Sequence, residues 1–547
     1  MAQLASVKYS SILPLGKTGN YVENQKIQFD INNRYSYIDG KQSYILLKVD
    51  NTSTQSSAPA GAVFPAQFPP HVGGHALFQR MDFREKPSSK LLESIDAYNS
   101  YVACMKSYGH DKDEYATMSM VEKVSAHNPL PQNRACDEPQ NNYFQPPASE
   151  EMDLSRGSNV ALTSSVVLPI HLGLFSNIGA DEHMALPNGA IGGTQLDIIL
   201  ERADVALSCQ AHNLQKEEVS GVVSKNSINV TDNLGCDAYL NTDTFVNISL
   251  NQCDLSKDVY GKQSPSNCAF RTDMAVQILA NDGTTINNTL VVTEVSTDGN
   301  QIQVRFNGQI GSVEGVSGFI RAEPPTYSYK LQPVLRVLET VPSNPSSILQ
   351  ALQKGINYKT TMLNKLSSPQ SLINQVLDIP AVVERAISLW VLPSIQNNLN
   401  AQNESNSRLY PQMETGLQYN YQWQILNYLI PNRQVEINKV VNRLSDNTIY
   451  YKQLEVAMRD ILENGLQAFI DGQDSTIGEI SNPMIIPIQL APNGRSFKLL
   501  DADAQLRLEN ENITNGAMPT IEAKLYHIYT NHTRTLMSNS EGNMIML

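Results

Sequence analysis

Short segments in which apolar and polar residues alternate recur along most of this chain, and this period-two pattern constrains its fold more than any other feature. Ile27, Phe29 and Ile31 alternate with Gln28 and Asp30, as expected of a strand with one buried face. Further short segments, alternating or largely apolar, predict strands at residues 44–49, 76–83, 160–175, 195–203, 245–250, 275–279, 290–295, 301–306, 329–341, 356–364, 371–378, 386–392, 484–490, 505–508 and 521–529. Residues 421–430 are apolar and aromatic. The sequence therefore predicts an all-β fold.

Helical spacing of apolar residues is confined to a few segments. It predicts one helix over residues 89–106 and a second from Leu454 to about Gly465, with a short helix ending at Leu352. The dipeptide Asp39-Gly40 predicts a turn between two strands. The helices are thus expected to lie in long connections of a β fold.

The spacing of the turns changes twice along the chain. Between residues 213 and 322, turn signals recur every ~8–12 residues, which predicts a small inserted β-domain. The blocks before and after it, 19–212 and 323–539, each contain enough strands for a two-sheet sandwich of roughly eight strands. Residues 1–18 and 540–547 are then an N-terminal arm and a C-terminal tail. The two large blocks could descend from a duplication.

Composition excludes several classes of protein. The 547 residues include 41% hydrophobic and 17% charged residues, enough apolar material for large cores. The net charge of −14 argues against specific binding to nucleic acid. We find no apolar run of the ~18 residues that span a bilayer and no signal peptide at the start. We therefore expect a protein that folds inside the cell, with no transmembrane segment.

Six cysteines are too few and too scattered for a disulfide scaffold, and no CxxC pair suggests a zinc ribbon. A disulfide among Cys236, Cys253 and Cys268 remains open. Cys104 lies between apolar residues in the first predicted helix, so we expect a buried thiol and not a nucleophile.

Motifs for catalysis or ligand binding are weak. Gly16-Lys17-Thr18 lacks the upstream glycine of a phosphate-binding loop, since that position holds Ser11. Gly311, Gly315 and Gly318 do not have the spacing of a dinucleotide-binding motif. We interpret both segments as turns.

Two histidine pairs, His71 with His75 and His527 with His532, lack the spacing of a metal-binding helix. Carboxylate pairs, which a glycosidase would need, occur at Asp181-Glu182 and at Asp501 with Asp503, in polar loops. The only tryptophans, Trp390 and Trp423, offer few aromatic platforms for a sugar. We therefore expect no catalytic residue, no cofactor and no metal site, and hence no enzyme.

Several segments, however, resemble a known family. They are Leu15-Gly16 to Asn20-Tyr21, Ile27-Gln28-Phe29, Ile38-Asp39-Gly40, Gly73 to Phe78, Ile95 with Tyr98-Asn99, Leu168 to Ser176, Leu186-Pro187, Leu196 to Ile198, Tyr421 to Trp423, and Ile430 to Asn432. In these the chain resembles the double jelly-roll major capsid proteins of double-stranded DNA viruses, the lineage of adenoviruses and tectiviruses. It looks closest to those of polinton-like viruses, adintoviruses and virophages.

The resemblance implies two fused eight-stranded jelly rolls with a small, tower-like β-domain inserted between them and a few short helices in long loops. It further implies a homotrimer that forms a pseudo-hexagonal capsomer, packs against neighbouring capsomers and tiles an icosahedral shell. A penton protein and minor capsid or cement proteins would be the other partners. The chain would fold in the host cell and reside in the virion capsid.

The last residues, Met544, Ile545, Met546 and Leu547, form an apolar tail that we expect to contact a neighbouring subunit or a minor protein; a disordered end is the alternative. Two other functions stay open at this stage. One is a secreted or surface β-sandwich adhesin that binds carbohydrate, and the other is a glycoside hydrolase with a β accessory domain.

Overall fold

The structure is a computed structural model of the 547-residue chain. Of the chain it describes residues 4–16, 19–32, 36–64, 66, 68, 72–109, 118, 121–123, 163–176, 185–207, 245–249, 272–280, 285–298, 301–309, 318–342, 350, 352–368, 374–380, 382–395, 417–438, 444–459, 462, 485–491, 496–500, 502–512, 524–538 and 544–546.

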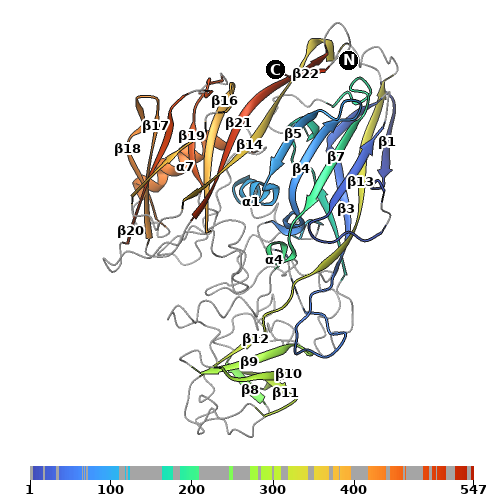
Figure 1. The fold of residues 1–547 in the computed structure, drawn as a ribbon, viewed down its shortest axis with the longest axis vertical. Coiled ribbons are helices and arrows are strands. Elements are labelled where there is room, and N and C mark those ends of the chain that lie inside the picture. Colours follow the sequence, from blue (N-terminus) through green and yellow to red (C-terminus); the bar gives the residue numbers. More distant parts are fainter. Residues whose placement is uncertain are drawn as a thin grey trace.

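Eight strands form a first sandwich of two antiparallel four-stranded sheets (Figure 1). One sheet has the order β1-β13-β3-β6 and the other the order β2-β7-β4-β5. These strands are β1 (Leu4–Ile12), β2 (Lys26–Ile31), β3 (Tyr37–Asn51), β4 (Phe78–Glu85), β5 (Leu91–Asp96), β6 (Thr163–Pro169), β7 (Thr194–Leu200) and β13 (Tyr329–Pro342).

A second sandwich has the same construction. Its sheets have the orders β14-β21-β16-β19 and β15-β20-β17-β18. These strands are β14 (Ile356–Ser368), β15 (Asn374–Asp378), β16 (Ala386–Ile395), β17 (Leu417–Ile425), β18 (Tyr428–Asn438), β19 (Ile486–Gln489), β20 (Ala504–Asn512) and β21 (Lys524–Ser538). A further short strand, β22 (Met544–Met546), pairs with β21.

The two sandwiches share one topology. When the strands of each sandwich are counted from one to eight in chain order, one sheet of each has the order 1-8-3-6 and the other the order 2-7-4-5. This is the strand order of a jelly roll. In each, the main helix follows the fifth strand: α1 (Tyr98–Gly109) in the first roll and α7 (Leu444–Met458) in the second. The chain is therefore a double jelly roll, as the sequence resemblance implied.

The inward faces of the strands form the core. In β2 the side chains of Ile27, Phe29 and Ile31 are fully buried, whereas Gln28 and Asp30 are half-buried. This alternation confirms the period-two prediction and places one face of the sheet against the other sheet of the sandwich.

Between the seventh and eighth strands of the first roll lies an inserted five-stranded sheet with the order β12-β9-β10-β11-β8. These strands are β8 (Phe245–Ser249), β9 (Ala275–Ala280), β10 (Thr285–Asp298), β11 (Gln301–Phe306) and β12 (Gly318–Ala322). Gln55 anchors the sheet, because its side chain bonds both the amide and the carbonyl of Ala275 and also the carbonyl of Glu323. Figure 1 shows the insert at one end of the long axis and β22 at the other.

Strand pairing divides the chain differently from the ranges expected from the sequence. β1 pairs with β13, and β13 pairs with β3. Residues 4–12, expected in an N-terminal arm, and residues 329–342, expected in the second block, are thus strands of the first roll. The insert interrupts the first roll before its last strand and does not separate two complete rolls.

Several local predictions were wrong. Residues 173–176, mostly within the strand expected over 160–175, are helical, and the helix expected from Leu454 to about Gly465 is α7, Leu444–Met458. Asp39-Gly40 does not end a strand but lies in a bulge of β3, where residues 40–43 face the single residue Val337 of β13. Gly40 is needed there because a Cβ would lie 1.8 Å from the Phe175 carbonyl oxygen. Residues 91–96, expected in a helix, form β5, because they pair with β4 at the edge of the sheet.

Short helices in the described part of the chain include η1 (Gly73–Leu77), α3 (Gly173–Ser176) and α4 (Ala203–Ala206). Residues 352–354 are also helical, next to the short helix predicted to end at Leu352. No helix among the described residues has the length and apolar character needed to cross a membrane.

Candidate functional site

A polar contact at Glu93 joins the two rolls. This β5 carboxylate is fully buried and accepts hydrogen bonds from the amides of Gly173 and Leu174, at 2.7 and 2.8 Å. It also accepts one from the Thr360 hydroxyl of β14, in the second roll, at 2.6 Å. Burial raises the pKa of Glu93, while these hydrogen bonds and the charge of Arg534 act in the opposite direction. We call the contact between β5 and β14 the junction.

Two further contacts hold β5 against β14 at the junction. The Tyr358 hydroxyl donates to the Leu92 carbonyl at 2.9 Å, and Lys365 Nζ lies 2.9 Å from Asp96. Gly173 of the first roll also approaches closely, since a Cβ there would lie 1.7 Å from the Lys359 carbonyl oxygen.

An aromatic stack extends the contact between the rolls beyond the strand edges. The rings of Trp390 and Tyr529, on β16 and β21, are stacked with centroids 4.0 Å apart. The ring centroid of Tyr101, on α1, lies 6.2 Å from that of Trp390 and 6.1 Å from that of Tyr529. All three side chains are buried, so the rolls share one continuous apolar interior at this point. Contacts of this kind fix the relative orientation of the two rolls.

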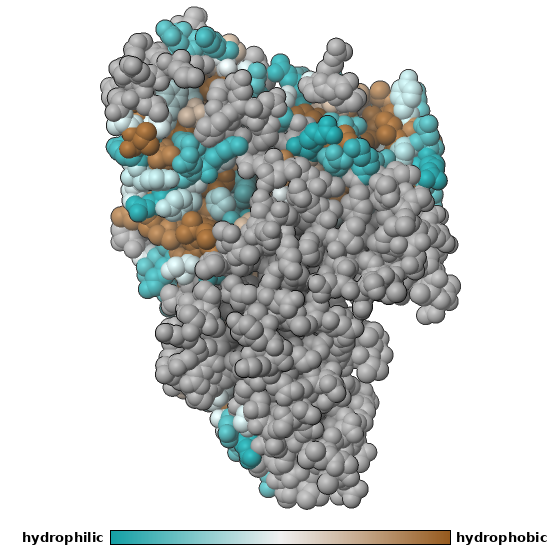
Figure 2. Space-filling model, turned by 180° about the vertical axis from the view of Figure 1, so that it is seen from behind, coloured by the Kyte–Doolittle hydropathy of each residue, from teal (hydrophilic) through white to brown (hydrophobic). Residues whose placement is uncertain are grey.

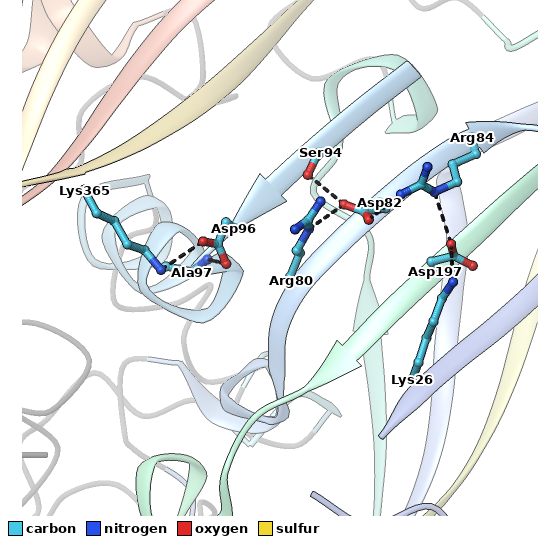
Figure 3. Close-up of polar contacts among 9 residues, drawn as sticks. All are labelled: Lys26, Arg80, Asp82, Arg84, Ser94, Asp96, Ala97, Asp197 and Lys365. Carbon is cyan, nitrogen blue, oxygen red and sulfur yellow. Dashed lines mark hydrogen bonds and ion pairs between the residues drawn. The ribbon is translucent and has the colours of Figure 1, made fainter. Parts of the chain in front are cut away.

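Charged side chains cross the whole sheet β2-β7-β4-β5 (Figure 3). Asp197 pairs with Lys26 at 2.8 Å and with Arg84 at 3.2 Å. Asp82 accepts hydrogen bonds from Arg80 at 2.8 Å, from Arg84 at 3.0 Å and from Ser94 at 2.6 Å.

The net effect on Asp82 is a lowered pKa. Burial alone would raise the pKa of this carboxyl, but the hydrogen bonds from Arg80, Ser94 and Arg84 lower it. The row of ion pairs continues to the Asp96–Lys365 contact, so the polar face of this sheet leads into the junction (Figure 3).

Exposed apolar side chains gather at two strand edges. The described residues include eleven large apolar side chains that are exposed. Val7, Tyr9, Leu13 and Leu15 lie on β1 and the segment after it, and Leu426, Tyr428, Leu429 and Ile430 lie at the turn from β17 into β18. Figure 2 shows apolar surface among polar surface on the described parts of the molecule. Clusters of this kind are typical of contact sites between proteins.

Three of the four histidines in the two pairs, His75, His527 and His532, lie in the interior. His75 Nε2 donates to the Pro169 carbonyl at 2.9 Å, and Nδ1 lies 3.5 Å from Glu122. Burial and the nearby Lys106 lower the pKa of His75 to about 4. Burial likewise lowers the pKa of His527 and of His532, both on β21, to about 4. His71 lies outside the described residues.

Other candidate residues are dispersed. Cys104 is buried, as predicted, and burial raises the pKa of its thiol. Asp503 is exposed, and Gly318 is the first residue of β12. The other candidates lie outside the described residues; they are Asp181, Glu182, Asp501, Gly311, Gly315, Cys236, Cys253 and Cys268. Within the described part of the chain, no three His, Cys, Asp or Glu side chains gather as a metal site requires.

The tail residues 544–546 form β22, with Met546 opposite Leu536 and Met544 opposite Ser538 of β21. Leu547 lies outside the described residues. The backbone of this segment thus extends a sheet of the second roll. Its contact with a neighbouring subunit or a minor protein stays a prediction.

Comparison with solved structures finds virus capsids. The chain is similar to the PBCV-1 virus capsid (9% identity, TM-score 0.46, covering 100% of this chain and 97% of that one). It is also similar to the Sputnik virophage structure (11%, 0.48, 100% and 89%) and to the Faustovirus major capsid protein (9%, 0.48, 98% and 91%).

Neither protein-family models nor curated proteins give a match. Because the TM-scores of the three structures lie below 0.5, the assignment of the fold rests on the strand pairing of this chain itself.

Proposed function

We propose that this chain is the major capsid protein of a double-stranded DNA virus, a structural subunit that assembles with copies of itself into an icosahedral shell. One observation carries the proposal: two jelly rolls with identical strand order are fused in one chain and locked together by a buried junction. The chain is therefore a rigid block with two equivalent halves.

Such a block suits the tiling of a shell. Three copies around an axis bring six jelly rolls together, so a trimer acquires a nearly hexagonal outline although it has only three-fold symmetry. Hexagonal blocks pack edge to edge in a sheet. Jelly rolls are suited to this role because their two packed sheets leave few long open edges for wrong pairing.

The two ends of the long axis would then have different roles. The insert lies at one end and β22 at the other (Figure 1). In this proposal the insert projects outward as a tower, and the end with β22 meets partners in the shell. Those partners are neighbouring capsomers, a penton protein and minor capsid or cement proteins.

The tail, Met544 to Leu547, is part of the proposal. Deleting residues 540–547 should lower the yield of particles without unfolding the subunit. An unchanged yield would exclude a role for the tail in contacts between subunits.

Light scattering on the purified chain tests the proposed function. We expect a species of three times 60.5 kDa, or larger assemblies, over a range of salt and pH. A monomer that persists at every concentration and condition would contradict the proposal and would leave the adhesin and hydrolase alternatives to be tested with glycans.

A further inference from the structure

A buried cluster of charged and titratable side chains joins α1, η1 and the segment around Glu122. Lys106 of α1 and His75 of η1 both face the carboxylate of Glu122. Lys106 Nζ lies 2.5 Å from Glu122 Oε2, and His75 Nδ1 lies 3.5 Å from the same oxygen. None of the three side chains is more than 9% exposed. The cluster therefore ties this segment to both helices from within the interior.

Backbone hydrogen bonds hold the same segment on η1. The Gly74 amide, next to His75 in the chain, donates to the Glu122 carbonyl at 2.8 Å. The Glu122 amide donates to the Met118 carbonyl at 2.7 Å, and Lys106 Nζ also lies 3.5 Å from Met118 Sδ. Glu122 thus holds η1 with its backbone and α1 with its side chain. The Gly74 amide reports whether this contact is closed.

The neutral ring of His75 fits the cluster poorly on one side. Nε2 lies 2.9 Å from the Pro169 carbonyl, and because a carbonyl only accepts, Nε2 carries the proton. Nδ1 then directs a lone pair toward the Glu122 carboxylate. A second proton would let Nδ1 donate to Glu122, but it would also place a second positive charge beside Lys106. Protonation of His75 therefore sets two buried cations in competition for this carboxylate.

The surroundings of His75 make its uptake of a proton depend on whether the segment is closed. Burial and the charge of Lys106 lower the pKa of His75 to about 4, whereas Glu122 acts in the opposite direction. An exposed histidine titrates near pH 6.5. The stability that the closed contact owes to His75 is complete above about pH 6.5 and is lost as the pH falls toward 4. The rings of Tyr98 on α1 and of His171 also lie beside His75, with centroids at 6.1 and 5.3 Å.

Helix α1 is also the part of the first roll that packs into the second. Its Tyr101 lies against the stacked rings of Trp390 and Tyr529. At its end, a Cβ on Gly109 would lie 3.0 Å from the Leu462 side chain. A change that loosens α1 should therefore also loosen the contact between the rolls.

We propose that His75, Lys106 and Glu122 form an acid-operated latch on α1. At neutral pH, Glu122 holds its segment against η1 and α1. When His75 takes up a proton, the segment opens, α1 loosens and the contact between the two rolls weakens. The latch lies within one chain, so this inference goes beyond the proposed function and does not depend on it.

Hydrogen exchange at the Gly74 amide of the full chain tests the latch between pH 7 and pH 5. Rates are corrected for the intrinsic effect of pH on exchange. A histidine with a pKa of about 4 when closed and about 6.5 when open raises the opening constant about 20-fold over this interval. His75→Gln retains a donor for the Pro169 carbonyl but cannot titrate, so the rise should disappear. The control, His532→Gln, removes another buried histidine and should keep the rise.

A second variant, Lys106→Met, separates a latch from a buried ion pair that only stabilises the fold. Without the competing cation, protonated His75 can pair with Glu122. Acid should then close the segment, so that exchange at Gly74 slows between pH 7 and pH 5. A purely structural ion pair would give faster exchange at both pH values without this reversal. If Lys106→Met does not fold, the comparison with His75→Gln decides the proposal alone.

The effect on the contact between the rolls is measured by fluorescence. Trp423→Phe leaves Trp390 as the only tryptophan, and its emission should shift to the red over the same pH range as Gly74 opens. An unchanged emission would refute the link from the latch to the rolls.

Three results at Gly74 overturn the latch itself. They are an opening constant of the natural chain that is equal at pH 7 and pH 5, a rise that persists in His75→Gln, and a rise that His171→Gln abolishes while His75→Gln does not.

Discussion

Replacing Glu93 with glutamine should destabilise the chain by about 2–4 kcal/mol. Oε1 of Glu93 accepts from Gly173 and Thr360, and Oε2 accepts from Leu174. A glutamine carbonyl can take the place of Oε1, but its amino group then faces the Leu174 amide. One hydrogen bond to a charged group, about 1.5–3 kcal/mol, is lost, and a buried donor is left unpaired at about 1–3 kcal/mol. The burial cost of the charge, which raises the pKa of Glu93, offsets part of this sum.

Urea unfolding measures the loss of stability, and hydrogen exchange at the Leu174 amide reports the local effect. Thr360→Val removes a single hydrogen bond and should cost about 1–2 kcal/mol. The control is Glu294→Gln on the insert, where the carboxylate is exposed; it should stay within about 0.5 kcal/mol. A loss below about 1 kcal/mol for Glu93→Gln, with unchanged exchange at Leu174, would refute the structural role assigned to this carboxylate.

Three further changes probe the same interior. Gly173→Ala should destabilise the chain by about 3 kcal/mol in urea unfolding, because the added Cβ meets the Lys359 carbonyl. Gly19→Ala is the control, since a Cβ there has nothing within 4 Å and should change the free energy of unfolding little. Equal effects of the two substitutions would contradict the close approach at Gly173. Trp390→Ala should cost about 3–5 kcal/mol through loss of the stacked contact, and a loss below 1 kcal/mol would argue against that stack. His532 is protonated near pH 6.5 in the unfolded chain but only near pH 4 when folded, so the stability it contributes is complete above about pH 6.5 and is lost as the pH falls toward 4. His532→Gln should therefore reduce the drop in stability between pH 7 and pH 5 by roughly 2 kcal/mol, and an unchanged drop would show that this histidine is not buried in neutral form.

The strands and the class of fold follow from sequence because they depend on local patterns. The alternation in residues 27–31 and the apolar segments near residues 386–392 and 484–490 each predicted a strand that the structure contains. The helix predicted from apolar spacing at Leu454 and its neighbours overlaps α7 only over residues 454–458. In all of these, residues close in sequence decide the local structure.

The grouping of strands into rolls could not be predicted in this way. β1 pairs with β13 across more than 300 residues, and the insert separates β13 from the rest of its roll. No pattern of neighbouring residues indicates pairing between strands so far apart in the sequence. Likewise, Leu91, Leu92 and Ile95 have helical spacing, but pairing with β4 outweighs this preference.

The residues that join the rolls were missed for a related reason. Nothing in the sequence around Glu93 indicates that its carboxylate is buried. It becomes a buried acceptor only through Gly173 and Thr360, which are distant in sequence. The exposed apolar residues at the start of β18 are easier to recognise in the sequence. Tyr428, Leu429 and Ile430 are consecutive apolar residues directly after a hairpin turn, where a solvated strand would alternate.

The most direct test of the account is electron microscopy of the assembled subunits in negative stain. If the two jelly rolls of each chain are equivalent parts of one ring, averaged views along the axis of the particle should show six similar lobes around a centre, from three chains. Averages with two lobes, or with three lobes formed by compact, separate subunits, would contradict the proposal that each chain contributes two equivalent rolls to the particle.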